Sequence, residues 1–276
     1  MIEVGDFIIK GLRKSYDGFL LDIPELVFRQ GYVTGIIGDN GAGKTTLIGC
    51  MTGSAVPDAG EIDSGGMLPA GVVFDECPFP PDLKARKLSA VFAHMFPDWD
   101  PRRFDDLLEE FRIDRSKHVK EYSRGMRMKV QVAAALSHPT GMLVLDEPTA
   151  GMDPASREEF LDVIRDYMVD EGHTVVMSSH ITTDVEKIAD YVVLIEDGKA
   201  VLEGEKDAIM SRFGILHASS DGGLRGQGIV RRRMEPHGCS YLIDGRDEFR
   251  RSHPDMVVDP ASLEDLMIMM SRGEEA

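Results

Sequence analysis

Residues 38–46 read Gly-Asp-Asn-Gly-Ala-Gly-Lys-Thr-Thr and satisfy the phosphate-loop pattern G-x-x-x-x-G-K-[ST] at every fixed position. An apolar run at 32–37 precedes this loop and a helix-like stretch at 45–51 follows it. In that context the glycines let backbone N–H groups turn toward phosphate oxygens, and the helix N-terminus adds partial positive charge. We expect Lys44 to reach the β- and γ-phosphates and the Thr45 hydroxyl to bind Mg²⁺. The pattern thus predicts a nucleotide site formed by Gly38, Asn40, Gly41, Ala42, Gly43, Lys44, Thr45 and Thr46.

A second apolar run, at 141–145, ends in the two carboxylates Asp146 and Glu147. In a P-loop protein an acid at this place holds Mg²⁺, directly or through water, and Asp146 fits that role. Glu147 lies one residue beyond the strand and is predicted to orient or deprotonate the attacking water. Taken alone, the two acids fit a solvated pair at a strand end equally well, and the P-loop upstream favours the catalytic interpretation.

The segment Ser123-Arg124-Gly125-Met126 precedes a helix predicted to start near Arg127. A serine here is typical of a helix N-cap. The alternative is an anion site, in which the hydroxyl, a glycine N–H and the helix N-terminus contact a phosphate held by a second subunit. Local chemistry alone favours the cap.

Composition limits the possible partners. The chain has 276 residues, 42% of them hydrophobic, which suits one large domain with a small appendage or two modest domains. A net charge of −17 would repel a nucleic-acid backbone. Cys50, Cys77 and Cys239 share no metal-binding spacing and fit a reducing cytosol. The acidic opening does not resemble a signal peptide, and no apolar run approaches the ~18 residues of a membrane span, so any membrane role is expected to come through a partner.

Alternating strand and helix patterns predict an α/β fold with a mostly parallel sheet. An antiparallel pair around an Asp17-Gly18 turn is expected at the start of the chain, and a hairpin around Asp197-Gly198 later. The expected strands are 7–12, 19–28, 33–37, 70–74, 142–145, 174–177, 191–195 and 200–203, and the expected helices are 88–111 (broken at Pro97 and Pro101), 127–136 and 155–169.

A domain boundary is expected near residues 215–225, where Ser219, Ser220, Gly222 and Gly223 cluster. It divides the chain into residues 1–215 and a small α+β accessory domain at 222–276. The second unit is predicted to hold two or three strands and a last helix from Ser262.

Five segments in a fixed order resemble the ATP-binding cassette (ABC) ATPases. They are the P-loop, 122–126 (Tyr-Ser-Arg-Gly-Met), 145–149 (Leu-Asp-Glu-Pro-Thr), 150–154 (Ala-Gly-Met-Asp-Pro) and 178–180 (Ser-Ser-His). The resemblance covers residues 1 to about 210. It implies a P-loop NTPase fold with an N-terminal antiparallel β subdomain and a helical subdomain at about 78–135. It also implies a nucleotide-sandwich dimer, in which each ATP is held by the P-loop of one subunit and the signature loop of the other.

The resemblance implies further site residues. Tyr16 matches the aromatic that stacks on adenine, the alternative being an ordinary hairpin-turn tyrosine. Ser123 and Gly125 match the signature residues that touch the γ-phosphate across the dimer. Asp153 matches the loop residue that links the two sites, and His180 matches the histidine that contacts the γ-phosphate. The implied catalytic set is therefore Lys44, Glu147 and His180.

Two departures from the family pattern matter for the site. The signature reads Tyr-Ser-Arg-Gly-Met where the family most often has Leu-Ser-Gly-Gly-Gln, so Arg124 replaces a glycine and Met126 replaces an amide. Asp75 stands where the family usually has the glutamine that contacts Mg²⁺ and water. A carboxylate is a stronger Mg²⁺ ligand than an amide but repels the γ-phosphate. The expected metal residues are therefore Thr45, Asp146 and Asp75, with a solvent-facing acidic loop as the alternative for Asp75.

The resemblance implies an ATP-hydrolysing transporter subunit that uses ATP and Mg²⁺. Its expected partners are a second ATP-binding subunit and an integral membrane permease, at the cytoplasmic face of the cell membrane. The variant signature and residues 260–265 resemble the bacterial exporter branch. A soluble ABC ATPase of DNA repair or translation is disfavoured, since residues from 221 onward carry 8 Lys/Arg against 11 Asp/Glu, a net of −3, and no nucleic-acid partner is expected. A nucleotide-gated regulatory module is left open by Asp75.

Overall fold

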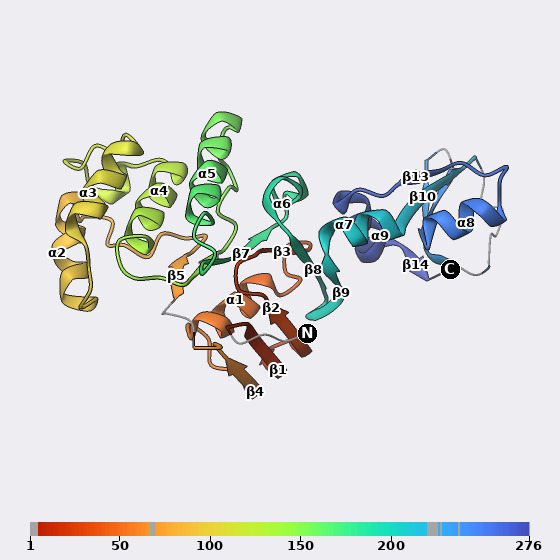
Figure 1. The fold of residues 1–276 in the computed structure, drawn as a ribbon, viewed down its shortest axis with the longest axis horizontal. Coiled ribbons are helices and arrows are strands. Elements are labelled where there is room, and N and C mark those ends of the chain that lie inside the picture. The colour runs from red at the N-terminus through yellow and green to blue at the C-terminus, as the bar shows by residue number, and fades with distance from the viewer. Residues whose placement is uncertain (1–4, 67–69, 220–225, 227, 237, 276) are drawn as a thin grey trace.

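The P-loop leaves the middle of a six-stranded, mostly parallel sheet (Figure 1). The computed structural model describes residues 5–66, 70–219, 226, 228–236 and 238–275. Five strands of this sheet run parallel and the last is antiparallel, which confirms the predicted α/β class. In spatial order they are β5 (Ala70–Val73), β6 (Met142–Leu145), β7 (Thr174–Ser179), β3 (Val33–Ile37), β8 (Tyr191–Glu196) and β9 (Lys199–Glu205).

Alternate residues of these strands supply two cores, one on each face of the sheet. On β6, Leu143 and Leu145 join the first core, while Met142 and Val144 join the second. This division follows from the two-residue period of a strand. The first core packs helices α4 (Arg124–Ala135), α5 (Pro154–Tyr167) and α6 (Thr182–Ile188), and the second packs α1 (Lys44–Thr52) and the N-terminal strands. Burial on both faces explains why these strands read as continuous apolar runs.

A separate three-stranded antiparallel sheet covers α1, in the order β2-β1-β4. Strands β1 (Phe7–Tyr16) and β2 (Phe19–Phe28) pair from Tyr16↔Phe19 to Phe7↔Phe28, so the predicted turn at Asp17-Gly18 is confirmed. β4 (Ala59–Asp63) was not predicted, because its short sequence, Ala-Gly-Glu-Ile-Asp, is exposed at four of five positions and shows no apolar alternation.

The helical lobe has an aromatic core of its own. Helix α2 (Ala85–Met95) and α3 (Pro101–Glu110) are separated at the predicted prolines, and Asp100 caps α3 by accepting from the N–H groups of Arg102 and Arg103. Phe92, Trp99 and Phe104 pack against α4 and the short helix η1 (Val119–Glu121). Figure 1 shows this lobe on the far side of the central sheet from the C-terminal lobe.

The C-terminal lobe is a five-stranded sheet in the order β13-β10-β12-β11-β14. Its strands are β10 (Phe213–Ala218), β11 (Ile229–Glu235), β12 (Gly238–Asp244), β13 (Val258–Pro260) and β14 (Glu274–Glu275). Its helices are α7 (Lys206–Arg212), α8 (Arg246–Ser252) and α9 (Leu263–Arg272). The last helix is capped by Ser262 with Asp265, as the sequence predicted for its start.

The predicted boundary near 215–225 needs a correction. Strand β10 pairs with β12 and β13, so the C-terminal sheet already begins at Phe213. Ser220, Gly222 and Gly223, on which the boundary rested, lie outside the described residues. A Ser/Gly cluster marks a loop, but it does not tell whether the strand before it pairs backward or forward. The lobe docks on the core through α9, where Leu263 and Leu266 join the first core and the Leu263 N–H donates to Glu186 Oε1 at 3.0 Å.

Helices α6, α7 and α8 were also absent from the sequence prediction. Each has seven residues, about two turns, which is too short for a 3.6-residue apolar period to stand out. None of the three has a side-chain N-cap hydrogen bond, so the usual start signal was missing too.

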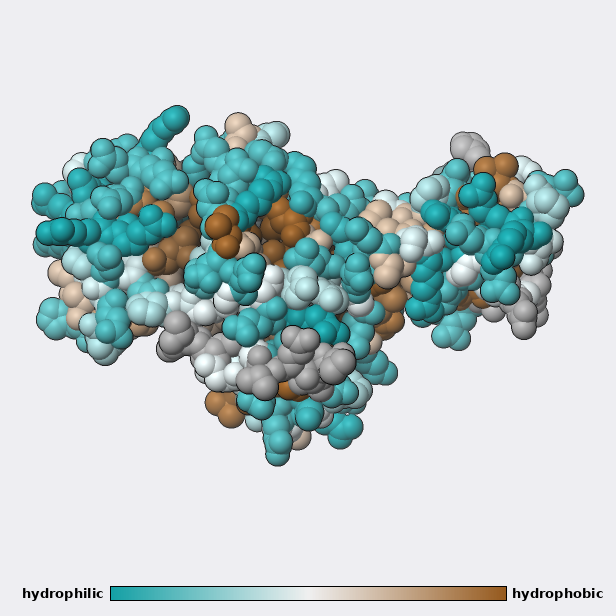
Figure 2. Space-filling view, in the orientation of Figure 1, coloured by the Kyte–Doolittle hydropathy of each residue, from teal (hydrophilic) through white to brown (hydrophobic). Residues whose placement is uncertain are grey.

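Most of the face seen in Figure 2 is polar, with apolar side chains in the recesses where the lobes meet. Within the described ranges, no helix combines the length and the apolar character that crossing a membrane requires.

Gly35 sets how closely α6 can pack on β3. A Cβ built at this glycine would lie 2.2 Å from Val185 Cγ1, and Val185 is fully buried. We expect Gly35→Ala to lower the free energy of unfolding by about 1–3 kcal/mol, since overpacking forces a shift in a dense core. Thermal unfolding midpoints by circular dichroism measure this, and Val185→Ala added to Gly35→Ala is expected to recover part of the loss.

Gly172→Ala is the control, because this exposed glycine has ordinary φ and its nearest neighbour would be Asp170 Oδ1 at 3.3 Å. Equal midpoints for the Gly35 and Gly172 variants would contradict the packing argument.

Candidate nucleotide-binding site

The P-loop backbone is shaped by glycines with positive φ. Gly43 has φ 116° and precedes the first residue of α1, which has no side-chain N-cap. Gly38 has φ 156°, and a Cβ there would lie 2.3 Å from the Ile195 carbonyl oxygen. The first N–H groups of a helix have no intrahelical partner, so they are available to phosphate oxygens. The loop therefore has the geometry of an anion cradle.

The Lys44 side chain lies inside this cradle and is only 6% exposed. Its Nζ donates to the carbonyl oxygens of Gly38 at 2.8 Å and Asp39 at 3.2 Å. It also lies 3.2 Å from Glu147 Oε1. These contacts hold the ammonium group at the floor of the loop, where the sequence pattern placed it.

Asp146, Thr45 and Ser178 form a hydrogen-bonded group next to the loop. Ser178 Oγ donates to Asp146 Oδ1 at 2.6 Å. Burial raises the pKa of Asp146, and the nearby charges of Glu147 and Asp75 add to that increase, while hydrogen bonds with Ser178 and Thr45 oppose it. A hydroxyl and a carboxylate side by side are the hard oxygen donors that Mg²⁺ prefers. The donor set thus fits the expected metal.

Glu147 connects Lys44 to His180. Its Oε2 accepts from the His180 N–H at 3.2 Å and lies 2.7 Å from His180 Nδ1. Its Oε1 is buried near Lys44 without an aligned hydrogen bond. The three predicted catalytic side chains therefore meet, although they come from positions up to 136 residues apart.

The backbone at Glu147 is strained. Its φ of 47° lies in the left-handed region, which costs a non-glycine residue of order 1–3 kcal/mol. The Glu147 N–H donates to Ser178 Oγ at 2.9 Å, which helps to hold this conformation. Sequence reasoning quoted Ser178 within a motif but gave it no role. Its position in the sequence could have indicated this role. Ser178 lies near the end of β7, and Asp146 directly follows the end of the neighbouring parallel strand β6.

A cavity of about 360 Å³ opens above the loop. Tyr16 stands at its rim, 51% exposed, with Lys14 Nζ 5.5 Å from the ring centroid. An exposed ring beside a phosphate cradle suits stacking on a base. The lining residues are Tyr16, Phe19, Asn40, Gly41, Gly43, Lys44, Thr45, Thr46, Asp75 and Glu147, which include eight predicted nucleotide or metal residues and Glu147.

Ser123, Gly125 and Asp153 lie outside that lining. Ser123 caps α4, its Oγ accepting from the Met126 N–H at 3.2 Å, so the cap favoured by local chemistry is confirmed. Asp153 caps α5 by accepting from two backbone N–H groups. A hydrogen bond with the Ser156 side chain, together with these backbone hydrogen bonds, holds the pKa of Asp153 below its usual range. At Gly125 an added Cβ would approach only the Met152 side chain, at 3.6 Å. In the described part of one subunit, these residues therefore serve helix ends rather than the P-loop cavity.

Asp75 follows β5 and lies at the junction of two hollows. It lines the P-loop cavity, and it lines an adjoining hollow of about 350 Å³ with Arg124 and Gln131. Its carboxylate is 44% exposed and forms an ion pair with Arg124. The charged residue that replaces a signature glycine is thus in contact with the carboxylate that replaces the usual glutamine.

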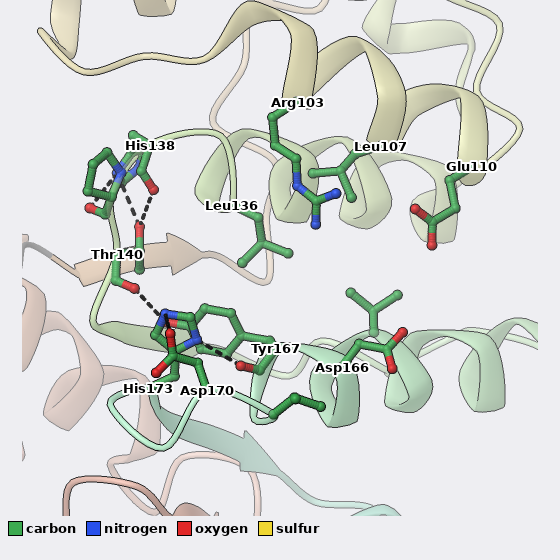
Figure 3. A pocket seen from close by; sticks show the side chains of 13 residues that line it. Arg103, Leu107, Glu110, Leu136, His138, Thr140, Asp166, Tyr167, Asp170 and His173 are labelled. Atoms are coloured by element: carbon green, nitrogen blue, oxygen red, sulfur yellow. Dashed lines mark hydrogen bonds and ion pairs between the residues drawn. The ribbon is translucent and has the colours of Figure 1, made fainter.

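A larger cavity, about 620 Å³, lies between α3 and α5 (Figure 3). The Tyr167 hydroxyl donates to the Thr140 carbonyl at 2.8 Å, and the His173 ring stacks on Tyr167 with centroids 4.1 Å apart. None of the predicted site residues is among those lining it. Cavity size therefore does not identify the nucleotide site.

Comparisons with known proteins agree with this geometry. A family model described as ABC transporter matches residues 21–150. Daunorubicin resistance ATP-binding protein DrrA3 of Streptomyces coeruleorubidus is 32% identical over 222 residues, covering 75% of this chain and 70% of the relative. Lantibiotic transport ATP-binding protein SrtF of Streptococcus pyogenes is 32% identical over 210 residues, covering 72% of this chain and 90% of the relative.

A solved ATP-binding subunit of an ABC transporter has the same fold, with a TM-score of 0.65 and 25% identity. The match covers 74% of this chain and 92% of the solved one. Together with the P-loop cradle and the convergence of Lys44, Glu147 and His180, these similarities show that the chain belongs to the ABC transporter family, as an ATP-binding and ATP-hydrolysing subunit.

Proposed function

We propose that this subunit closes with a second ATP-binding subunit around Mg-ATP and so energises a separate membrane permease. The observation that carries the proposal is the Glu147 carboxylate, held between Lys44 Nζ and His180 Nδ1 at the floor of the P-loop cavity. A carboxylate in that place is suited to accept a proton from water beside the γ-phosphate.

Each catalytic residue then has a separate task. Lys44 moves from Glu147 to the β- and γ-phosphate oxygens, because three ammonium donors can serve phosphate and loop carbonyls together. This movement leaves Glu147 Oε1 free to accept a hydrogen bond from the attacking water. As the water oxygen bonds to phosphorus, its proton passes to Glu147 and the bond to the ADP oxygen breaks. His180 orients the carboxylate and faces the charge that develops on the γ-phosphate.

Thr45 and Asp146 are the residues that would hold Mg²⁺, directly or through water, and Asp75 stands at the edge of the same cavity. When bound, the ion would neutralise charge on the phosphate oxygens.

Ser123, Gly125 and Asp153 are proposed to act across the dimer. The Ser123 oxygen accepts the Met126 N–H, and its O–H hydrogen can still be donated to a phosphate oxygen of the opposite nucleotide. Because these residues lie away from the P-loop cavity of their own chain, a second subunit is needed to complete each site.

The helical lobe, predicted from the sequence at about residues 78–135, is proposed to bind the permease at the cytoplasmic face of the membrane. The names of two relatives concern daunorubicin resistance and lantibiotic transport, and we infer a transported substrate of one of these kinds. Copurification of the tagged chain with an integral membrane protein tests the permease, and isolation of only this chain and its dimer from detergent-solubilised membranes would contradict it.

We expect Glu147→Gln to trap an ATP-bound dimer, because the amide keeps the shape of the carboxylate but cannot take the proton. Sizing chromatography with Mg-ATP should show a shift from monomer to dimer. Glu61→Gln, an exposed change in β4, is the control and should not shift. A Glu147→Gln chain that stays monomeric with nucleotide bound would speak against the sandwich.

We expect Lys44→Ala and His180→Ala to impair different steps, ATP binding in the first variant and ATP hydrolysis in the second. Lys44 contacts ground-state phosphates, so its removal should weaken ATP binding, measured with a fluorescent ATP analogue. His180 should mainly affect turnover, lowering kcat by about 10-fold or more while KM changes little. Wild-type turnover by the His180→Ala chain would remove this residue from the catalytic set.

A further inference from the structure

Arg124 and Asp75, two of the positions at which the chain departs from the family pattern, form an ion pair with each other. Arg124 is the first residue of α4, directly after the Ser123 cap. Asp75 is in the loop after β5 and lines the P-loop cavity together with Lys44 and Thr45. The pair thus joins the helix that carries the signature residues to the loop that faces the nucleotide.

A second contact fixes the same two segments. The side chain of Gln131, only 1% exposed, makes two hydrogen bonds to the Phe74 backbone: its Nε2 donates to the carbonyl and its Oε1 accepts from the N–H, each at 3.0 Å. Arg124 and Gln131 are seven residues apart, two turns along one face of α4. Because Gln131 anchors the residue next to Asp75, the carboxylate position does not depend on Arg124 alone.

The Arg124 side chain is also confined on its other side. A Cβ at Gly151 would lie 3.5 Å from Arg124 Cδ, so the aliphatic stem runs beside the loop that leads to Asp153. The stem of Arg124 thus lies beside this loop while its guanidinium group pairs with Asp75.

Negative charges surround Asp75, so a cationic partner stabilises its carboxylate. On the nucleotide side, Asp75 shares the cavity with Glu147. Burial raises the pKa of the neighbouring Asp146, and the charge of Asp75 adds a smaller increase. An uncompensated third carboxylate beside a triphosphate would oppose nucleotide binding. A neutral glutamine with a glycine at the Arg124 position would carry no such charge and need no such partner.

We propose that Arg124 is a positioning residue for ATP binding and hydrolysis, which neutralises the Asp75 carboxylate and holds it at the edge of the nucleotide cavity. The proposal rests on the proposed placement of the nucleotide over the P-loop. Arg124 acts through Asp75, and the two residues replace the usual neutral pair as a unit.

A double-mutant cycle on the full chain tests this, with KM for Mg-ATP and kcat measured for Arg124→Gln, Asp75→Asn and the combined variant. Arg124→Gln is expected to raise KM roughly 2- to 5-fold, the scale of half-exposed ion pairs. In the presence of Asp75→Asn the same change should alter KM less than about 2-fold, because no charge is left to compensate. Arg124→Lys should keep KM near the wild-type value.

Salt separates charge compensation from a structural role. Raising NaCl from about 0.05 to 0.5 M should shrink the KM effect of Arg124→Gln, since screening weakens exposed charges. The matched control is the pair Arg115–Asp105 in the helical lobe, whose exposures of 44% and 50% are close to the 46% and 44% of Arg124–Asp75. Arg115→Gln and Asp105→Asn should leave KM and its salt dependence unchanged.

The proposal would be overturned if Arg124→Gln changed KM by the same factor with and without Asp75→Asn. It would also be overturned if Arg115 and Asp105 showed the same coupling in KM as Arg124 and Asp75. Lys44→Ala distinguishes this failure from failure of the proposed function. If Lys44→Ala abolishes Mg-ATP binding while the cycle shows no coupling, only the role of Arg124 is wrong. If the wild-type chain does not bind Mg-ATP, or if Lys44→Ala leaves the binding unchanged, both proposals are wrong.

Discussion

The parallel pairing of β6, β7 and β3 is the constraint on which the site depends. The register matches Leu145 with Met177 and Ile37 with Ser179, so all three strands end at one edge of the sheet. The residues that follow them carry the P-loop, the carboxylates Asp146 and Glu147, and His180. A slip of one residue would turn the alternate apolar side chains to the wrong core and separate these groups. Packing in the two cores therefore fixes the strand register, and the register fixes the relative positions of the site residues.

The site concentrates charge in a place where charge is costly. Asp146 is 2% exposed and Lys44 5%, and each would be unfavourable without the hydrogen bonds that surround it. Ser178 serves both Asp146 and the strained Glu147 backbone, which makes one hydroxyl responsible for two groups. The more exposed carboxylate of Asp75 is also stabilised by a partner, the guanidinium group of Arg124. At this edge of the sheet Asp146 is thus stabilised by hydroxyl groups, Glu147 by Lys44 and Asp75 by Arg124.

The same residues that a second subunit would use are also structural in one chain. Ser123 and Asp153 each cap a helix, so their side chains already have fixed directions before any dimer forms. Preorganised groups lose less entropy on binding than mobile ones. Substitution at either residue would therefore lower helix stability in addition to its effect on the proposed dimer.

The sequence by itself determined the P-loop, the Asp17-Gly18 turn, the helix break at Pro97 and Pro101 and the start of the last helix at Ser262. Each of these depends on neighbours in the chain: a loop pattern, a turn dipeptide, a proline or a capping side chain.

Only the tertiary structure decided that β10 belongs to the C-terminal sheet, that Ser178 bridges Asp146 and Glu147, and that Arg124 pairs with Asp75, 49 residues away. These contacts join segments distant in sequence, so they leave no local periodicity or spacing to read. Their partners are set by which strands pair and which helix face packs, and that is fixed by burial of the whole core rather than by any one segment.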